Sequence, residues 1–220
     1  MHFSRYALFA SVSASAILLS SAAHSLPQGG QVAAGSATIA SSGSATTITQ
    51  GSGRAVLDWS SFDVGAGERV TFQQPSAAAV ALNRIGGQKP SEIFGRLTAN
   101  GQVILTNPNG LLFGPSSRVD VAGLVATTAT IGTDAFMRDA SWAFSSSGRP
   151  GASIVNRGTI TAREAGLVAL VAPAVENKGF IGARLGKIQL AGADTFTLDL
   201  YGDGLLSFAA AKGSVRVGNA

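Results

Sequence analysis

The chain carries few side chains that can catalyse a reaction or bind a metal. It has no cysteine, and its two histidines, His2 and His24, both lie near the N-terminus. Without cysteine the chain has no disulfide, no thiolate metal site and no thiol nucleophile. If the N-terminal segment is removed after export, one histidine or none remains. We therefore expect neither a Ser-His-Asp triad nor a histidine metal site.

Carboxylates are the remaining candidates for catalysis. The twelve acidic residues are dispersed, and Asp194, Asp199 and Asp203 are the nearest thing to a group. Acid–base hydrolysis and calcium-assisted lyase chemistry need clustered carboxylates, and this spacing matches no metal-binding loop. We therefore expect no enzyme activity, no cofactor and no metal.

The positively charged side chains do not indicate a nucleic-acid partner. Sixteen Lys and Arg against twelve Asp and Glu give a net charge of +4, and the basic residues are scattered with no run of three. Nucleic-acid-binding domains gather such residues into patches. The pattern predicts a solvated surface.

Composition and spacing predict the elements that would position any site. Only 13% of the residues are charged, 28 are glycine, and Ala, Ser, Thr and Val are abundant. Alternating runs at residues 46–49, 55–59 and 69–72 are separated by Gly and Ser, which is typical of short strands joined by turns. Residues 133–137 instead predict a helical turn with Thr133 as its N-cap.

Residues 1–25 have the pattern of a secretory signal peptide. A short basic region precedes a mostly apolar stretch at residues 6–19, and residues 22–25 offer small side chains for cleavage. A membrane anchor is the alternative, but the apolar stretch is shorter than the roughly 20 residues that a spanning helix needs. We therefore expect export by the Sec machinery and a mature domain at residues 26–220.

The best specified segment is a tight turn at Asn107-Pro108-Asn109-Gly110, between two apolar runs. The four residues fill the four places of a type I turn. Pro108 fixes φ at its place, and Gly110 lets the chain leave in any direction. Such a segment indicates architecture and recognition rather than catalysis.

The C-terminal part repeats with a period near 20 residues. Asn-x-Gly-x-Ile occurs at residues 156–160 and again, 21 residues on, at 177–181. Each copy continues with an apolar run that begins at glycine, at residues 166–170 and 186–190. Residues 99–103 suggest an earlier copy of the first half of the repeat, the Asn-x-Gly element. This period in a β pattern favours a solenoid over an antiparallel sandwich.

The solenoid has a simple expected geometry. A coil of ~20 residues holds three strands of ~4–5 residues, and successive coils stack ~4.8 Å apart. Asn and Gly are expected at bends that need left-handed backbone, and the amides of Asn156 and Asn177 are expected to stack and bridge. Trp59, Trp142 and the phenylalanines are expected to pack in the cap and the core.

Three stretches together closely resemble the secretion domain of two-partner secretion exoproteins, the N-terminal domain of the filamentous haemagglutinin family. They are residues 81–97, which contain Asn83-Arg84-Ile85, residues 99–128, which contain Asn107-Pro108-Asn109-Gly110, and residues 166–179. The resemblance covers about residues 28 to 200. The ordered combination of an Asn-Arg-Ile and an Asn-Pro-Asn-Gly element is specific to that family.

The resemblance implies an all-β fold. It would be a right-handed parallel β-helix with an N-terminal cap and a small extra-helical antiparallel element. It also implies a secretion signal, recognised in the periplasm by the POTRA domains of a cognate outer-membrane transporter. The domain would then reach the surface or exterior of a Gram-negative cell and nucleate folding of the β-helix there.

The same resemblance places the recognition motif at seven residues: Asn83, Arg84, Ile85, Asn107, Pro108, Asn109 and Gly110. Structural roles are the alternative. The first three would form a capped turn with a surface arginine, and the last four an ordinary solenoid turn that shapes a folding nucleus.

Two other functions fit a β-helix. One is a stand-alone surface adhesin or matrix protein, and the other is a carbohydrate-active enzyme, which the dispersed carboxylates disfavour. Family members usually continue into a long repetitive passenger, whereas this sequence stops at Ala220. If a passenger follows, a host or neighbouring-cell surface ligand is expected for it.

Overall fold

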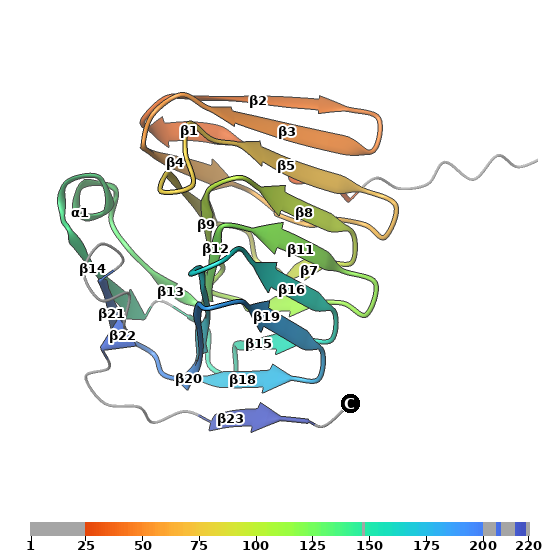
Figure 1. Ribbon diagram of the computed structural model, residues 1–220, viewed down its shortest axis with the longest axis vertical. Coiled ribbons are helices and arrows are strands. Elements are labelled where there is room, and N and C mark those ends of the chain that lie inside the picture. Colours follow the sequence, from red (N-terminus) through yellow and green to blue (C-terminus); the bar gives the residue numbers. More distant parts are fainter. Residues whose placement is uncertain (1–24, 147, 200–205, 208–213, 219–220) are drawn as a thin grey trace, which may run out of the picture.

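The computed structural model describes residues 25–146, 148–199, 206–207 and 214–218 (Figure 1). The predicted signal peptide, apart from Ser25, lies outside these residues, as do both histidines and Asp203. Within them, no helix combines the length and the apolar character needed to cross a membrane.

The chain winds into a parallel β-solenoid of about six turns, whose three faces are sheets that we number 1 to 3. Sheet 1 contains β1 (Gln31–Ala34), β4 (Arg54–Trp59), β6 (Val80–Ile85), β9 (Gln102–Thr106), β12 (Gly123–Thr127), β17 (Leu167–Ala172) and β20 (Lys187–Gly192). Sheet 2 contains β7 (Ser91–Ile93), β10 (Leu111–Phe113), β15 (Ser153–Asn156), β18 (Ala174–Asn177) and β23 (Ser214–Val217). Sheet 3 contains β2 (Ala37–Ser42), β3 (Ala45–Gln50), β5 (Arg69–Gln73), β8 (Arg96–Ala99), β11 (Arg118–Val121), β16 (Thr159–Ala162) and β19 (Phe180–Ala183).

The solenoid carries the two accessory features that were predicted. At the N-terminal end, β1 pairs antiparallel with β4 and β2 pairs antiparallel with β3, which caps the first coil. Beside sheet 1 lies an extra-helical element (Figure 1). It consists of β13 (Ala129–Thr130), α1 (Thr133–Arg138), β14 (Ser141–Ser146), β21 (Phe196–Asp199) and β22 (Leu206–Ser207), with antiparallel pairing between its strands. The predicted fold class is confirmed.

Two cores follow from the alternation of side chains along each strand. One fills the solenoid interior, where inward residues such as Leu57, Leu105 and Leu170 form ladders. The other lies between the outer face of sheet 1 and the extra-helical element, where Leu82 and Trp142 are buried. The middle of sheet 1 is covered on both faces, so β9, β12 and β17 read as nearly continuous apolar runs instead of alternating ones.

The repeat has the predicted register. Asn156 pairs with Asn177 and Leu167 with Lys187 on successive coils. The Asn156 Nδ2 donates a 2.7 Å hydrogen bond to Asn177 Oδ1, which confirms the expected amide bridge. The earlier copy proposed at residues 99–103 is wrong. Those residues join β8 to β9, whereas Asn156 leads from β15 to β16, a different corner of the coil.

Three local expectations are also wrong. The N-cap of α1 is Gly132, and Thr133 is the first helical residue. The described non-glycine residues with positive φ are Ala165 and Leu185, not asparagines. The described asparagines keep ordinary backbone, and their side chains bond neighbouring backbone, as when Asn156 Oδ1 accepts the amide of Gly158. Phe180 is 60% exposed instead of packed in the core.

Trp142 anchors the extra-helical element, so its removal should be costly. It is fully buried, its ring lies 4.8 Å from that of Phe136, and the Arg54 guanidinium lies over it. We expect Trp142→Ala to lower the free energy of unfolding by about 3–5 kcal/mol, because a large cavity remains. Urea denaturation measures this. As a control, Leu185→Ala removes a side chain that is 79% exposed and should change stability little. Equal losses in the two variants would contradict the assignment of this core.

Candidate functional site

The two predicted recognition elements lie side by side on adjacent coils. In the pairing of β6 with β9, Asn83 faces Leu105 and Arg84 faces Thr106. Continuing this register places Ile85 beside Asn107. The solenoid therefore brings all seven predicted residues to one corner, where sheet 1 leads into sheet 2.

Asn83 lies inside the solenoid and caps no turn. It is buried on β6, and its Oδ1 accepts a 3.0 Å hydrogen bond from the indole Nε1 of Trp59. Its Nδ2 donates to the carbonyls of Ala81 at 3.2 Å and Ile104 at 3.3 Å. Ile85 is buried in the same interior. Asn83 therefore satisfies an interior polar network, and the capped-turn interpretation is wrong.

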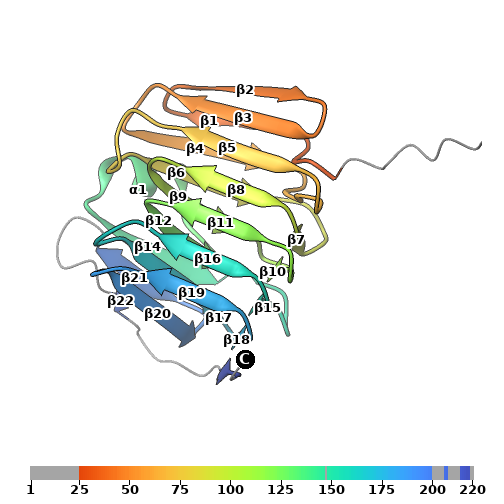
Figure 2. The ribbon, with the colours of Figure 1, turned by 45° about the vertical axis from the view of Figure 1, so that its right-hand side comes forward.

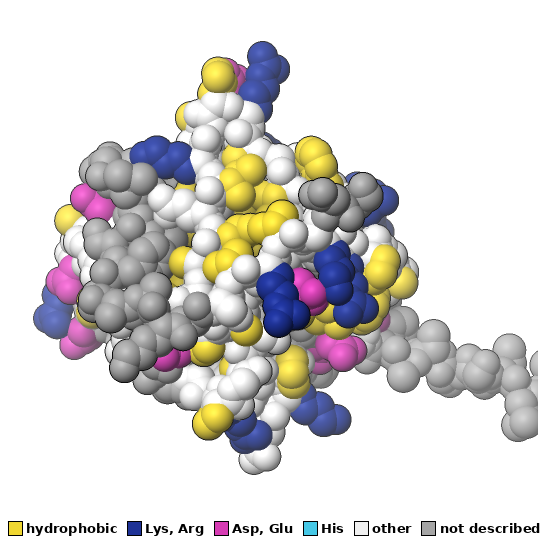
Figure 3. Space-filling view, turned by 90° about the horizontal axis from the view of Figure 1, so that it is seen from below, with side chains coloured by type: hydrophobic (Ala, Val, Ile, Leu, Met, Phe, Trp, Pro, Cys, Tyr) yellow, Lys and Arg dark blue, Asp and Glu magenta, His cyan; other side chains and the backbone are white. Residues whose placement is uncertain are grey.

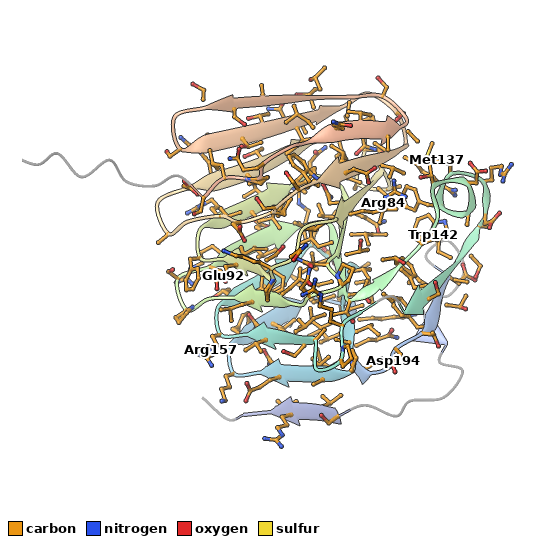
Figure 4. The ribbon with its side chains drawn as sticks, turned by 180° about the vertical axis from the view of Figure 1, so that it is seen from behind. Arg84, Glu92, Met137, Trp142, Arg157 and Asp194 are labelled. Atoms are coloured by element: carbon orange, nitrogen blue, oxygen red, sulfur yellow. The ribbon has the colours of Figure 1, made fainter. Side chains whose placement is uncertain are left out.

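Arg84 projects from the opposite face of β6 toward α1 (Figure 4). Its Nε and Nη2 donate to the two carboxylate oxygens of Asp58 at 2.7 and 2.9 Å, and its Nη1 donates to Thr133 Oγ1 at 2.9 Å. The side chain is 24% exposed. Arg84 is thus a bridge between sheet 1 and the extra-helical element, not a free surface arginine.

A second arginine holds the other end of the same helix. Arg54 of β4 donates through Nη1 to the carbonyls of Phe136, Met137 and Asp139. These are carbonyls at the C-terminal end of α1, which otherwise lack partners in a helix. Nothing in the sequence near Arg54 suggested this role, because the contact spans more than 80 residues.

The predicted tight turn is present at residues 107–110. The Gly110 amide donates to the Asn107 carbonyl at 2.9 Å, and the Asn109 amide donates to Asn107 Oδ1 at 2.9 Å. Gly110 has φ +111°, and a Cβ there would come within 2.5 Å of the Ser153 carbonyl oxygen. The position therefore requires glycine.

The side chains of this turn fasten it to the preceding coil. The Asn107 Nδ2 donates to the Lys89 carbonyl at 3.1 Å and to Ser91 Oγ at 3.0 Å. The Asn109 Nδ2 donates to the Gly87 carbonyl at 2.8 Å. Both amides thus hold residues 86–90, the connection between β6 and β7, together with Ser91 at the start of β7. We call residues 83–91 and 105–110 together the corner unit.

The other side of the turn touches the point where the extra-helical element leaves the solenoid. The Asn107 amide donates to the Thr127 carbonyl at 3.0 Å, and the Arg149 amide donates to the Pro108 carbonyl at 2.9 Å. Thr127 ends β12, and Arg149 comes shortly before β15. The turn therefore lies between the preceding coil and both ends of the excursion. The partners Lys89, Ser91, Thr127 and Arg149 were missed in the sequence because they act mostly through backbone groups.

Little of the seven-residue motif is accessible to a partner, although the connection that it holds is exposed at Gly86, Gln88, Lys89 and Pro90. Asn83, Ile85, Asn107 and Gly110 are buried, whereas Arg84, Pro108 and Asn109 are partly exposed. A hollow of about 250 Å³ adjoins the unit and is lined in part by Phe62, Asp63 and Lys89. Of the acidic group considered for catalysis, Asp194 is exposed just after β20, away from Arg84 (Figure 4), and Asp199 lies on β21 of the extra-helical element. The chemistry of the corner is hydrogen bonding and shape.

Asn107 should contribute more to stability than its neighbour Asn109. Asn107→Ala removes two donated and two accepted side-chain hydrogen bonds at a buried position. We expect the free energy of unfolding to fall by about 2–4 kcal/mol, because partners are left unsatisfied. Asn109→Ala, whose side chain is partly exposed, should cost about 1 kcal/mol. Chemical denaturation measures both, and the reverse order would contradict the described corner.

Arg84 should control the local stability of α1. Arg84→Gln breaks the bonds to Asp58 and Thr133, and we expect the Phe136 and Asp139 amides to exchange roughly fivefold faster, a loss of about 1 kcal/mol. Hydrogen exchange measures this. Arg138→Gln is the matched control, because its ion pair with Asp134 is exposed and should contribute little. Equal acceleration in both variants would exclude a bridging role for Arg84.

Known proteins share this fold and this sequence pattern. The family model described as TPS secretion domain matches residues 23–220. A heme/hemopexin-binding protein of Haemophilus influenzae is 46% identical over 106 residues, which are 48% of this chain and 12% of that protein. A second protein of that name and organism is 52% identical over 82 residues, or 37% of this chain and 9% of that protein. The chain thus spans a small part of the length of these relatives.

Two solved structures have the same architecture. The HMW1 secretion domain from Haemophilus influenzae superposes with a TM-score of 0.76 and 26% identity, covering 87% of this chain and 57% of that one. The filamentous hemagglutinin secretion domain superposes with a TM-score of 0.61 and 16% identity, covering 88% and 73%. The second likeness concerns the fold alone. With the family match over nearly the whole chain, these findings show that it belongs to the family of TPS (two-partner secretion) secretion domains.

Proposed function

We propose that residues 26–220 form the signal by which a two-partner secretion exoprotein is recognised in the periplasm by the POTRA domains of its transporter, after Sec export and removal of residues 1–25. Domains of this family are secreted across the outer membrane by a cognate transporter. Sec export, removal of residues 1–25 and recognition by the POTRA domains are the steps that we infer.

The observation that carries the proposal is the burial of four of the seven motif residues, Asn83, Ile85, Asn107 and Gly110, inside the corner unit. The two elements are joined there through side-chain amides and backbone bonds, and of the seven motif residues only Arg84, Pro108 and Asn109 reach the surface. The buried residues act by shaping the corner, and the three exposed ones are the candidates for transporter contact. The two roles, folding and recognition, thus fall on different residues of the same motif.

Physical chemistry supports a mechanism in which recognition precedes folding. An extended, partly folded chain can add a strand to an exposed sheet edge of a POTRA domain. Solenoid coils contact chiefly their neighbours, so they can form one after another as the chain emerges. The corner unit joins two adjacent coils and the excursion, so it is suited to nucleate folding of the β-helix at the cell surface.

Secretion should respond to the exposed turn residues more than stability does. We expect Pro108→Ala and Asn109→Ala to reduce export several-fold while shifting the unfolding midpoint by only about 2–4 °C, because each loses at most about 1 kcal/mol. The full chain is co-expressed with its transporter, and secreted protein is quantified beside thermal unfolding of the purified chain. Pro115→Ala, at an exposed proline of another turn, is the matched control.

The outcomes separate the two roles. Normal export of Pro115→Ala with poor export of Pro108→Ala would support contact at the turn. If export falls only in proportion to lost stability, with Asn107→Ala affected most, the turn is a folding nucleus and contact at Pro108 and Asn109 is wrong.

A further inference from the structure

Three arginines that are far apart in sequence form a column on the outer face of sheet 3. Arg69 of β5 pairs with Arg96 of β8, and Arg96 pairs with Arg118 of β11. Figure 2 shows these strands stacked in succession. Adjacent strands lie about 4.8 Å apart, so the three side chains begin at that spacing along the solenoid axis. The scattered basic residues of the sequence are here gathered into a patch.

No acidic side chain among the described residues forms an ion pair with the three arginines. Within the described part of the chain, the Arg69 and Arg96 side chains have no hydrogen bond or ion pair, and Arg118 donates only to the neutral acceptors Ser117 carbonyl and Thr159 Oγ1. Glu68 lies nearby, but its carboxylate accepts bonds from Ser25 and from the Gly65 amide. Like charges on directly paired strands destabilise a sheet. A bound anion would offset that repulsion.

The three arginines line one hollow of about 450 Å³. Its other walls are small or polar residues such as Ser44, Gly67 and Ser116, together with Glu68, the carboxylate already bonded to Ser25 and Gly65. Protein interfaces usually centre on buried aromatic and aliphatic side chains, and this hollow offers none. Guanidinium groups instead match carboxylate and sulfate oxygens with paired hydrogen bonds. The hollow therefore suits a polar, anionic ligand.

The same column continues to an exposed aromatic ring. Arg118 pairs with Thr159, and Thr159 pairs with Phe180 of β19. The Phe180 ring lies over Gly182, since a Cβ built there would meet ring atoms at 2.9 Å, and the side chain is 60% exposed. Figure 3 views this end of the molecule, where hydrophobic, basic and acidic side chains are all exposed. From Arg69 to Phe180 the column spans four strand spacings, roughly 19 Å.

We propose that this column binds a linear acidic polysaccharide. Arg69, Arg96 and Arg118 would hold its carboxylate or sulfate groups, Thr159 a hydroxyl, and the flat face of Phe180 a sugar ring. The strand spacing is similar to the length of one sugar in an extended chain, so successive charged sugars can meet successive arginines. This surface lies on sheet 3, away from the corner unit, and the activity is separate from secretion.

The test measures binding of fluorescent oligosaccharides to the purified full chain by polarisation at low salt. The probes are a polygalacturonate decasaccharide, which carries carboxylates, a heparin decasaccharide, which carries sulfates as well, and a neutral dextran of equal length. We expect binding of at least one acidic probe, weakened by salt, and none of dextran. Arg96→Gln should weaken it about tenfold or more. Phe180→Ala should weaken it while leaving the salt dependence unchanged.

Arg184→Gln is the matched control, because Arg184 is exposed at the other end of β19 from Phe180 and its loss changes the net charge equally. It should bind as the unaltered chain does. Thermal unfolding should show Arg96→Gln at least as stable as the parent, since repulsion is removed. No binding of either acidic probe, or equal weakening by Arg184→Gln, would overturn the proposal. So would loss of transporter binding in Arg96→Gln with glycan binding intact, which would assign the column to a protein partner.

Discussion

The structure depends on the register between stacked parallel coils. Each strand bonds the strands directly before and after it in its sheet, so every side chain lies above its counterpart one coil earlier. This constraint turns sequence distances of about 20 residues into neighbours. It aligns the interior ladders, the Asn156–Asn177 amide bridge and the arginine column. It also brings the Asn-Arg-Ile and Asn-Pro-Asn-Gly elements to one corner.

At that corner the register is secured by side-chain amides. Asn83 satisfies the interior next to Trp59, while Asn107 and Asn109 hold the connection that follows β6. Arg84 and Arg54 then attach α1 to the outer face of sheet 1. A family motif that reads as a surface signal is thus largely internal. Its conspicuous residue types follow from buried hydrogen-bonding needs as much as from any partner.

Much of the fold could be predicted from the sequence, because its signals are local. The Asn107–Gly110 turn, the period near 20 and the alternation of strands each depend on a few neighbouring residues. The cap of α1, the burial of Asn83 and the exposure of Phe180 depend on which distant strand lies alongside, and local patterns do not contain that information. Lys89, Thr127 and Arg149 could not be predicted as part of the site for a related reason. Each bonds the turn through a backbone group, which any residue type can supply, so the side chain gives no signal.

The buried residues of the corner unit form an interlocked part of the core and not a mobile surface signal. Site-resolved hydrogen exchange of the full chain tests this most directly through the Ser91, Asn107 and Gly110 amides, which donate to the Gly110, Thr127 and Asn107 carbonyls. The account predicts protection equal to that of Leu105 in the adjacent strand, with all of them opening together. Exchange of these amides as fast as in the exposed turn at Gly43 would contradict it.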